Sequence, residues 1–458
     1  MLRGTSVNRK RALLLVDLKY RDLPGLALVK VLLECKGPYD VVLAPHAAGY
    51  SDQLALVNGN FHLVAFPQYL QQEQVTRAHF LKRHGIGVAV IPTEGTSLLN
   101  EVRLQIAGRF VDSSPVDLFF IWNGSIADLV QAHRTIPWER CIVGGVPRFD
   151  FYHPRFRSLR LSRDRFCEKY ALNPEHRIVT WATNFGWVKL RGERLSTIQR
   201  IERRYREEGL HGTFWSRDLQ GVVEREIESR ELLTDQLLHF ARKFPEVNVI
   251  IKVHPGERPE WYERRVASAG LKNVRVISQE YMFNVLEATD VHLHRSCTTA
   301  IEAWLLGKPT IDLQFAPREY HFSEELALGG DVAFSREDCM AKIAHYVAGG
   351  ALPSEQATHR PRIIEWFCGQ VDGQSALRHV EAIQRWLEGS DNQRTMPSAT
   401  SKDLRLAVIL QIKSLLGLQP YDSLRAWLRG DFRRHFTSSE VEMWVEMIRK
   451  TLRNQKPQ

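Results

Sequence analysis

Short runs of consecutive hydrophobic residues recur along the first third of the chain, separated by segments with hydrophobic residues at helical spacing. Strands that are apolar throughout are typical of a parallel sheet covered by helices on both faces. The runs predict strands at residues 12–18, 41–44, 63–66, 87–91, 118–122 and 141–144. Helices are predicted between them at residues 25–33, 69–83 and 97–108.

The same alternation restarts after a break rich in proline and polar residues at 147–154. Further strands are predicted at residues 178–182, 247–253, 274–277, 291–293 and 310–313, and helices at 222–244, 259–269, 297–306, 336–347 and 376–387. The pattern therefore predicts an α/β protein with two Rossmann-type, doubly wound parallel-sheet lobes, at residues 1–150 and 151–390. Such a fold does not by itself decide the activity.

A helical appendage is predicted at residues 391–458, after the polar linker 390–401. It carries two apolar stripes at helical spacing, one made of Leu404, Val408, Ile412, Leu415 and Leu416, the other of Val441, Trp444, Val445, Ile448 and Leu452. Arginines and lysines accompany both stripes. Two interpretations stay open: attachment to an anionic membrane surface, or a helical bundle that packs on the protein itself.

The composition indicates a protein with anionic partners. The formal net charge is +9, which favours nucleotide phosphates or an anionic inner-membrane surface. Nucleic acid is not expected, because no recognised nucleic-acid module is present and the arginines of 191–206 are interleaved with glutamates. Six scattered cysteines without a Cys-x-x-Cys pair indicate reduced thiols and no zinc site. The first apolar run is too short for a signal peptide, so we expect a cytoplasmic protein, peripheral on the inner face of the cytoplasmic membrane.

Polar residues follow two predicted strands of the second half, where open α/β sheets bind their ligands. Lys252 and His254 stand at the end of the strand 247–253, and Pro255 makes that exit rigid. A histidine there can stabilise the charge that develops on a departing phosphate, or it can merely cap the strand. Lys252 or Arg295 could supply further positive charge.

The turn after the strand 291–293 is richer in phosphate ligands. It contains Arg295, Ser296, Thr298 and Thr299, and hydroxyls at a helix start can bind a phosphate or simply cap the helix. Glu302, on the same helix, could accept from ribose hydroxyls or face solvent. Asn184, after the strand 178–182, is a further candidate for donor binding.

In the first half, Glu94 and Gly95 follow the strand 87–91, and Asn123 follows the strand 118–122. A partly buried glutamate with a raised pKa could deprotonate an acceptor hydroxyl. Gly95 would allow the acceptor to approach closely, and Asn123 would help to bind it. The alternative for Glu94 is a carboxylate that complements the dipole of the following helix.

The order of four short motifs resembles that of bacterial surface carbohydrate biosynthesis proteins. The motifs are Gly145-Val146-Pro147-Arg148-Phe149-Asp150, Thr183-Asn184-Phe185, His254-Pro255, and the segment from Ser296 to Lys308. More distantly, the Glu-Gly, His-Pro and Ser/Thr motifs are similar to those of bacterial sialyltransferases, polysialyltransferases and capsular Kdo transferases. Thr93 stands where these families usually have a second acid, and Val146 where they usually have asparagine.

The resemblance implies a GT-B-like fold and transfer from a CMP-activated sugar to a surface glycan or glycolipid in capsule or lipopolysaccharide biosynthesis. It also implies that Glu94 activates the acceptor, while His254, Ser296, Thr298 and Thr299 surround the CMP phosphate. The chain has no Asp-x-Asp metal motif. We therefore expect no metal, and no cofactor besides the nucleotide-sugar donor, which is a substrate.

Three other functions stay open. A CDP-glycerol-type polyol-phosphate transferase would also release CMP, and a UDP-sugar transferase or epimerase would bind UDP. A non-catalytic scaffold of polysaccharide assembly would bind without reacting.

Overall fold

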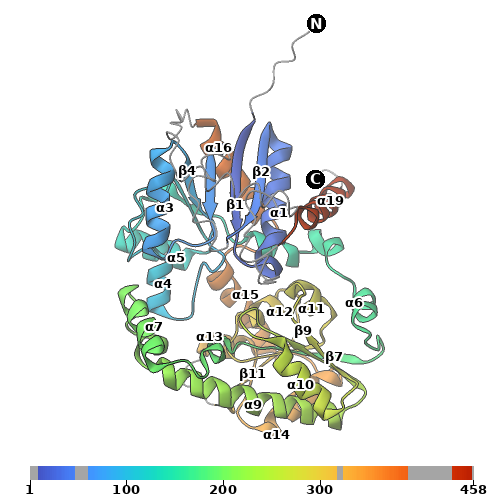
Figure 1. The fold of residues 1–458 in the computed structure, drawn as a ribbon. Coiled ribbons are helices and arrows are strands. Elements are labelled where there is room, and N and C mark those ends of the chain that lie inside the picture. The colour runs from blue at the N-terminus through green and yellow to red at the C-terminus, as the bar shows by residue number, and fades with distance from the viewer. Residues whose placement is uncertain (1–8, 47–59, 317–322, 390–435, 456–458) are drawn as a thin grey trace, which may run out of the picture. The chain divides into compact units, whose positions relative to one another are not determined.

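The computed structural model describes residues 9–46, 60–316, 323–389 and 436–455 (Figure 1). The chain forms two compact units, which are described one by one. Unit 1 contains residues 1–159 and 367–458, and unit 2 contains residues 160–366.

Unit 1 is built on a six-stranded parallel sheet. Its strands, within the described ranges, are β1 (Lys10–Val16), β2 (Tyr39–Pro45), β3 (Leu63–Phe66), β4 (Gly87–Val90), β5 (Leu118–Ile121) and β6 (Cys141–Val143). Their order across the sheet is β2-β1-β3-β4-β5-β6. The chain therefore reverses direction across the sheet between β1 and β3, and open α/β sheets bind ligands beyond the strand ends at such a switch point.

Helices cover both faces of this sheet (Figure 1). They are α1 (Lys19–Lys36), α3 (Gln72–Arg83), α4 (Asn100–Ile106), α5 (Gly124–His133), α16 (Ser375–Gly389) and α19 (Ser438–Asn454). One core joins β1, β3, β4 and β5 with α3 and α5, through residues such as Val64, Ala78 and Val130. Helix α1 packs against α16 and α19. The 3-10 helices η2 (Trp138–Arg140), η3 (Pro147–Tyr152) and η4 (Pro154–Leu159) complete the unit.

Unit 2 repeats the architecture. Its strands are β7 (Arg177–Ala182), β8 (Val247–Lys252), β9 (Val274–Ile277), β10 (Val291–His294), β11 (Thr310–Leu313) and β12 (Asp331–Ala333), in the order β12-β11-β10-β7-β8-β9. The strand pairs of its sheet are parallel, and the switch point lies between β7 and β10.

The helices of unit 2 again cover two sheet faces. They are α6 (Arg163–Tyr170), α7 (Leu195–Glu207), α8 (Phe214–Arg217), α9 (Leu219–Lys243), α10 (Pro259–Ala269), α11 (Met282–Ala288), α12 (Thr299–Trp304), α13 (Glu324–Gly329) and α14 (Arg336–Val347), with the 3-10 helix η5 (Gly186–Leu190). Helix α15 (Ser354–Cys368) runs up to the division between the units. The larger core lies under α9, α10 and α14, and a smaller one lies under α6 and α11.

The predicted fold class is confirmed: both units are parallel, doubly wound α/β sheets. Each of the eleven predicted strands overlaps an observed strand. The division into units differs from the predicted lobe 151–390, because residues 367–389 pack with unit 1. Asp150 accepts hydrogen bonds from the backbone N–H groups of Ser375 and Ala376 (3.0 and 2.8 Å), and His379 stacks on Phe120.

Of the two apolar stripes predicted in the appendage, the first lies outside the described residues. The second belongs to α19, where Trp444, Val445 and Ile448 are buried and Trp444 packs edge-on against Phe151. This stripe therefore packs on the protein itself. Among the helices of the described ranges, none combines the length and the hydropathy that a membrane span requires.

Candidate functional site

Hydrogen bonds join three neighbouring strand exits at the switch point of unit 2. After β7, the Thr183 hydroxyl accepts the backbone N–H of His254, at the exit of β8, at 2.9 Å. The next residue, Asn184, donates to the backbone carbonyl of Arg295, at the exit of β10, at 2.7 Å. The structure thus places the His-Pro turn and the Arg-Ser turn on one sheet edge, at the exits of β8 and β10 on either side of β7.

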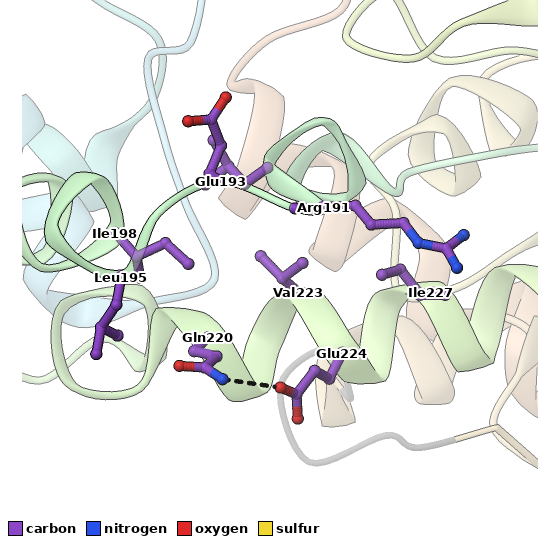
Figure 2. A pocket seen from close by; sticks show the side chains of 10 residues that line it. Arg191, Glu193, Leu195, Ile198, Gln220, Val223, Glu224 and Ile227 are labelled. Carbon is purple, nitrogen blue, oxygen red and sulfur yellow. Dashed lines mark hydrogen bonds between the residues drawn. The ribbon is translucent and has the colours of Figure 1, made fainter.

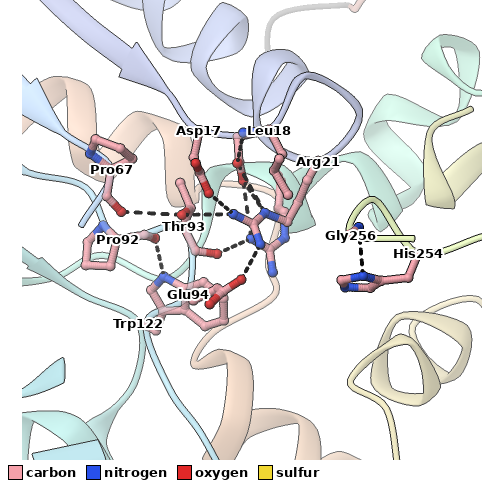
Figure 3. A network of polar contacts seen from close by, with 12 residues as sticks. Asp17, Leu18, Arg21, Pro67, Pro92, Thr93, Glu94, Trp122, His254 and Gly256 are labelled. Atoms are coloured by element: carbon pink, nitrogen blue, oxygen red, sulfur yellow. Dashed lines mark hydrogen bonds and ion pairs between the residues drawn. The ribbon is translucent and has the colours of Figure 1, made fainter. Parts of the chain in front are cut away.

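His254 lies at the surface of this edge with a defined tautomer. Its Nδ1 accepts the backbone N–H of Gly256 at 3.0 Å (Figure 3). Because Nδ1 is an acceptor, the neutral ring carries its proton on Nε2, which can donate a hydrogen bond to an anionic oxygen. A Cβ added to Gly256 would stand 3.1 Å from Nδ1, so a glycine here leaves room for the imidazole.

A buried carboxylate fixes the His-Pro turn from below. Glu257 accepts hydrogen bonds from the Thr183 hydroxyl at 2.7 Å, from the Phe185 backbone N–H at 3.0 Å, and from the Tyr262 hydroxyl. Because the Thr183 hydroxyl donates its proton to Glu257, its oxygen can accept the hydrogen bond from the His254 backbone N–H. Burial raises the pKa of Glu257. The sequence pattern gave no role to Glu257, since only the fold shows that the chain turns its side chain inward.

Ser296 shapes the turn after β10. It adopts a left-handed backbone conformation (φ +40°), which is strained for a residue other than glycine. Its N–H and hydroxyl donate to the Asp312 carboxylate at 2.8 and 2.7 Å, and its oxygen accepts from Gln314 at 3.1 Å and the Ser323 N–H at 3.2 Å. Its hydroxyl is therefore engaged within the protein, and the phosphate contact predicted for it would have to replace these bonds.

The other hydroxyls of this turn differ in exposure. Thr298 is exposed, whereas Thr299 is half-buried and its hydroxyl bonds His292 at 2.9 Å. Asn184 is half-buried and tied to Arg295 through both ends of its amide. Of the predicted donor-site residues, His254 and Thr298 thus present the most exposed polar groups.

The two cations predicted to supply positive charge are buried. Arg295 is 1% exposed; its guanidinium lies over the Phe185 ring and 3.6 Å from Glu226. Its side chain points into the unit, because the buried Glu226 carboxylate attracts it there. In this structure Arg295 therefore reaches no ligand at the surface.

Lys252 is 7% exposed and donates to the Ser278 carbonyl at 3.2 Å. Burial lowers its pKa to about 8, although the carboxylates of Glu280 and Glu302 act in the opposite direction. Glu302 is half-buried and contributes to the charge environment of Lys252. Lys252 can thus add positive electrostatic potential at the sheet edge, but its ammonium group is not exposed for direct contact with a ligand.

In unit 1, Glu94 belongs to a charged cluster at the switch point (Figure 3). Arg21 binds Glu94 at 2.5 Å, Asp17 at 2.9 Å and Asp22 at 3.0 Å, and it also donates to the Thr93 hydroxyl at 3.0 Å. The charges of these carboxylates outweigh the burial that opposes them, so the pKa of Arg21 is raised. The partial burial expected for Glu94 is wrong: its side chain is 62% exposed.

Sequence reasoning missed Asp17, Arg21 and Asp22. Their signal in the sequence is the charged segment 17–22 at the end of the first apolar run. In the fold, β1 lies beside β3 and β3 beside β4, so the exits of β1 and β4 come close together.

Gly95 and Asn123 have structural surroundings that the predictions did not foresee. A Cβ on Gly95 would stand 2.2 Å from the Trp122 indole, so the glycine makes room for this ring and not for a ligand. Asn123 is fully buried and caps α5, accepting from Ile126 at 2.9 Å and donating to the Phe367 carbonyl at 2.7 Å. The acceptor contact predicted for Asn123 is therefore not possible in this structure.

The motif from Gly145 to Asp150 supports the same region of unit 1. Arg148 lies over the Trp122 ring and donates to the Thr93 carbonyl at 2.6 Å, which braces the turn that presents Glu94. Asp150 caps α16, and burial raises its pKa to about 6. Over the described part of the chain, no group of three or more His, Cys, Asp and Glu side chains is arranged to hold a metal ion.

Comparison with solved structures finds chains of similar fold at low sequence identity. A variant of the wall teichoic acid polymerase TagF superposes with a TM-score of 0.52 at 10% identity, covering 83% of this chain and 89% of that one. The same variant soaked with CDPG gives a TM-score of 0.51 at 10% identity, with the same coverage of both chains. A UDP-GlcNAc 2-epimerase from Neisseria meningitidis, bound to UDP-GlcNAc, gives 0.49 at 14% identity, covering 82% of this chain and all of that one.

No protein-family model matches the chain, and no curated protein matches it by sequence. At identities this low, likeness between structures shows the fold alone. The likeness to TagF confirms the GT-B-like fold that the motifs imply.

Proposed function

We propose that this protein is a transferase of surface-polymer biosynthesis that uses a cytidine nucleotide donor and releases CMP. The observation that carries the proposal is the connected edge of unit 2, where an exposed imidazole with its proton on Nε2 and an exposed threonine follow the strands on either side of β7. Hydrogen-bond donors fixed before the reaction are suited to a charge that develops on a leaving phosphate.

The leading donor is a CMP-activated sugar. In its transfer, the bond between the sugar carbon and the phosphate oxygen of CMP breaks, and the acceptor hydroxyl forms the new bond to that carbon. His254 would donate from Nε2 to the departing phosphate, and Glu94 would take the proton of the acceptor hydroxyl. Thr298 and Thr299 would hold the phosphate, with Lys252 adding positive charge below its pKa of about 8. The acceptor would be a surface glycan or a lipid-linked glycan.

The second candidate is a CDP-glycerol-type polyol-phosphate transferase, which the fold likeness to TagF favours. There the bond between the two phosphates of the donor breaks, the acceptor oxygen attacks the outer phosphorus, and CMP again leaves. The two candidates make the same demand on His254, but their products differ, because only the second contains a phosphodiester.

A donor screen with a crude lipid-linked acceptor, following release of CMP or UDP, tests the proposal. We expect CMP release that falls at least a hundredfold in His254→Ala. His239→Ala is the matched control, because His239 is an exposed histidine on α9 of the same unit. Phosphodiester analysis of the product separates the two candidates. Release of UDP, or wild-type turnover by His254→Ala, would contradict the proposal, and no release from any donor would favour a scaffold.

A further inference from the structure

The segment between β7 and α9 forms a cationic surface that the proposed transfer reaction does not use. We call it the arginine hairpin; it consists of η5, α7 and α8, residues 186–217. Seven basic side chains of the hairpin are exposed against two acidic ones, Glu193 and Glu207. The exposed basic residues are Lys189, Arg191, Arg194, Arg200, Arg203, Arg204 and Arg217.

The remaining acids of the hairpin are half-buried and engaged. Glu202 accepts the backbone N–H of Leu219 at 2.8 Å, where it helps to start α9, and Glu208 pairs with Arg204 at 3.5 Å. Glu208 thus offsets the charge of Arg204, and six exposed basic side chains remain against Glu193 and Glu207. The surface is positive, and it suits an anionic partner.

A cavity of about 230 Å³ with polar and apolar walls opens within this surface (Figure 2). It lies between the loop before α7 and the first turns of α9, and its apolar walls come from Leu190, Leu195, Ile198, Val223 and Ile227. The side chain of Leu195 is 55% exposed, next to the exposed Arg194 in the chain. Arg191, Glu193, Gln220 and Glu224 bring polar groups to the same cavity, where Gln220 donates to Glu224 at 3.1 Å.

Cationic residues beside an exposed leucine and a partly apolar cavity match the interface of an anionic lipid bilayer. Arginines bind lipid phosphates there, and apolar side chains reach the acyl region. A soluble polyanion would satisfy the arginines equally well, but it would gain nothing from Leu195 or from the apolar walls. We infer that the arginine hairpin docks this protein on an anionic membrane, with Leu195 inserted and the cavity receiving part of an acyl chain.

This assignment moves the membrane contact away from the stripe in α19 that the sequence suggested. The exposed fractions of Trp444 and Ile448 are 3% and 0%, so this stripe is used inside unit 1. The inference also does not depend on the nucleotide chemistry, since vesicle binding and CMP release are measured separately.

Flotation of the full-length protein tests the inference with vesicles of phosphatidylcholine alone or mixed with phosphatidylglycerol. We expect binding only to the anionic vesicles, weakened by salt because the contact is electrostatic. Each basic side chain near the surface contributes about fivefold to partitioning, so Arg200→Glu with Arg203→Glu should lower it at least about 25-fold. The matched control is Arg264→Glu with Lys272→Glu, an equal charge change on exposed residues elsewhere in unit 2.

The apolar part of the inference has its own pair of variants. Leu195→Asp should lower binding to anionic vesicles about tenfold or more, whereas Leu328→Asp, at a leucine that is 48% exposed, should leave it unchanged. Equal losses in each variant and its control would overturn the inference. The inference would also be overturned if the protein did not bind vesicles but bound polyphosphate, and if the arginine substitutions weakened that binding.

Discussion

Replacing Thr183 by valine tests whether the hydrogen bonds beneath the His-Pro turn position His254. Valine has nearly the shape of threonine but cannot donate to Glu257 or accept from the His254 backbone. We expect the fold of unit 2 to survive and the turn to lose its fixed geometry. CMP release should then fall about tenfold or more, because a misplaced donor no longer meets the developing charge.

The cost in stability follows from the bonds that are lost. Thr183 is 2% exposed, and the substitution removes one acceptor from a buried N–H and one donor from a buried carboxylate. Leaving one buried group unsatisfied costs about 1–3 kcal/mol. We therefore expect unit 2 to lose about 2–4 kcal/mol, less than the sum because the turn can relax.

Thr180→Val is the matched control. Thr180 lies on β7, three residues before Thr183, and is fully buried. Its hydroxyl bonds the Thr289 hydroxyl at 2.7 Å and makes no contact with the His-Pro turn. Urea unfolding should show losses of similar size for both variants, whereas CMP release at the same pH should fall only in Thr183→Val. Thr183→Ser should restore most of the release. Equal activity losses in the two valine variants would refute the positioning role, since they would then reflect stability alone.

Three further predictions concern individual side chains. Burial lowers the pKa of Lys252 to about 8, so the folded protein loses this proton at a lower pH than the unfolded chain does. The free energy of unfolding of the wild type, relative to that of Lys252→Met, should therefore rise by up to about 3 kcal/mol between pH 8 and 10.5. Urea titrations would measure this difference, and a constant difference would contradict the burial. Ser296→Ala should be less stable than Ser296→Gly by about 1 kcal/mol in thermal unfolding, because glycine adopts the φ of +40° without strain. Arg21→Met should cost about 3 kcal/mol in urea unfolding, because the buried Asp22 carboxylate loses its nearer cation and keeps only Arg148 at 3.5 Å. Adding Asp22→Asn should recover part of that loss, and no recovery would show that the pair is not the cause.

The strands were predictable because a parallel sheet covered on both faces needs uninterrupted apolar segments. The strand β12 was missed, since it has only three residues and begins with Asp331. Helix α1 begins at Lys19 and contains Pro24 in its first turns, although the prediction placed its start at Gly25. The order of the strands in the sheet was not predictable. β1 pairs with β3 instead of lying at the edge, and the local sequence does not encode on which side of β1 the chain returns.

The candidate site was predictable as a set of strand exits but not as a set of side-chain directions. His254 and Thr298 reach the surface as expected. Asn123 stands at an equivalent exit and turns inward, where it caps a helix and binds the Phe367 carbonyl far away in the sequence. Arg295 turns toward Glu226, a residue of α9 that no spacing rule connects with it. Contacts between distant segments decided these directions.

Calorimetric titration of the full-length protein with CMP, CDP and UDP measures which nucleotide unit 2 prefers and whether His254 contacts it. We expect CMP and CDP to bind to the wild type and UDP to bind at least tenfold more weakly. His254→Ala should weaken CMP binding at least tenfold, whereas His239→Ala should leave it unchanged. Absence of binding by all three nucleotides, or equal CMP affinity in wild type and His254→Ala, would contradict the proposed nucleotide site.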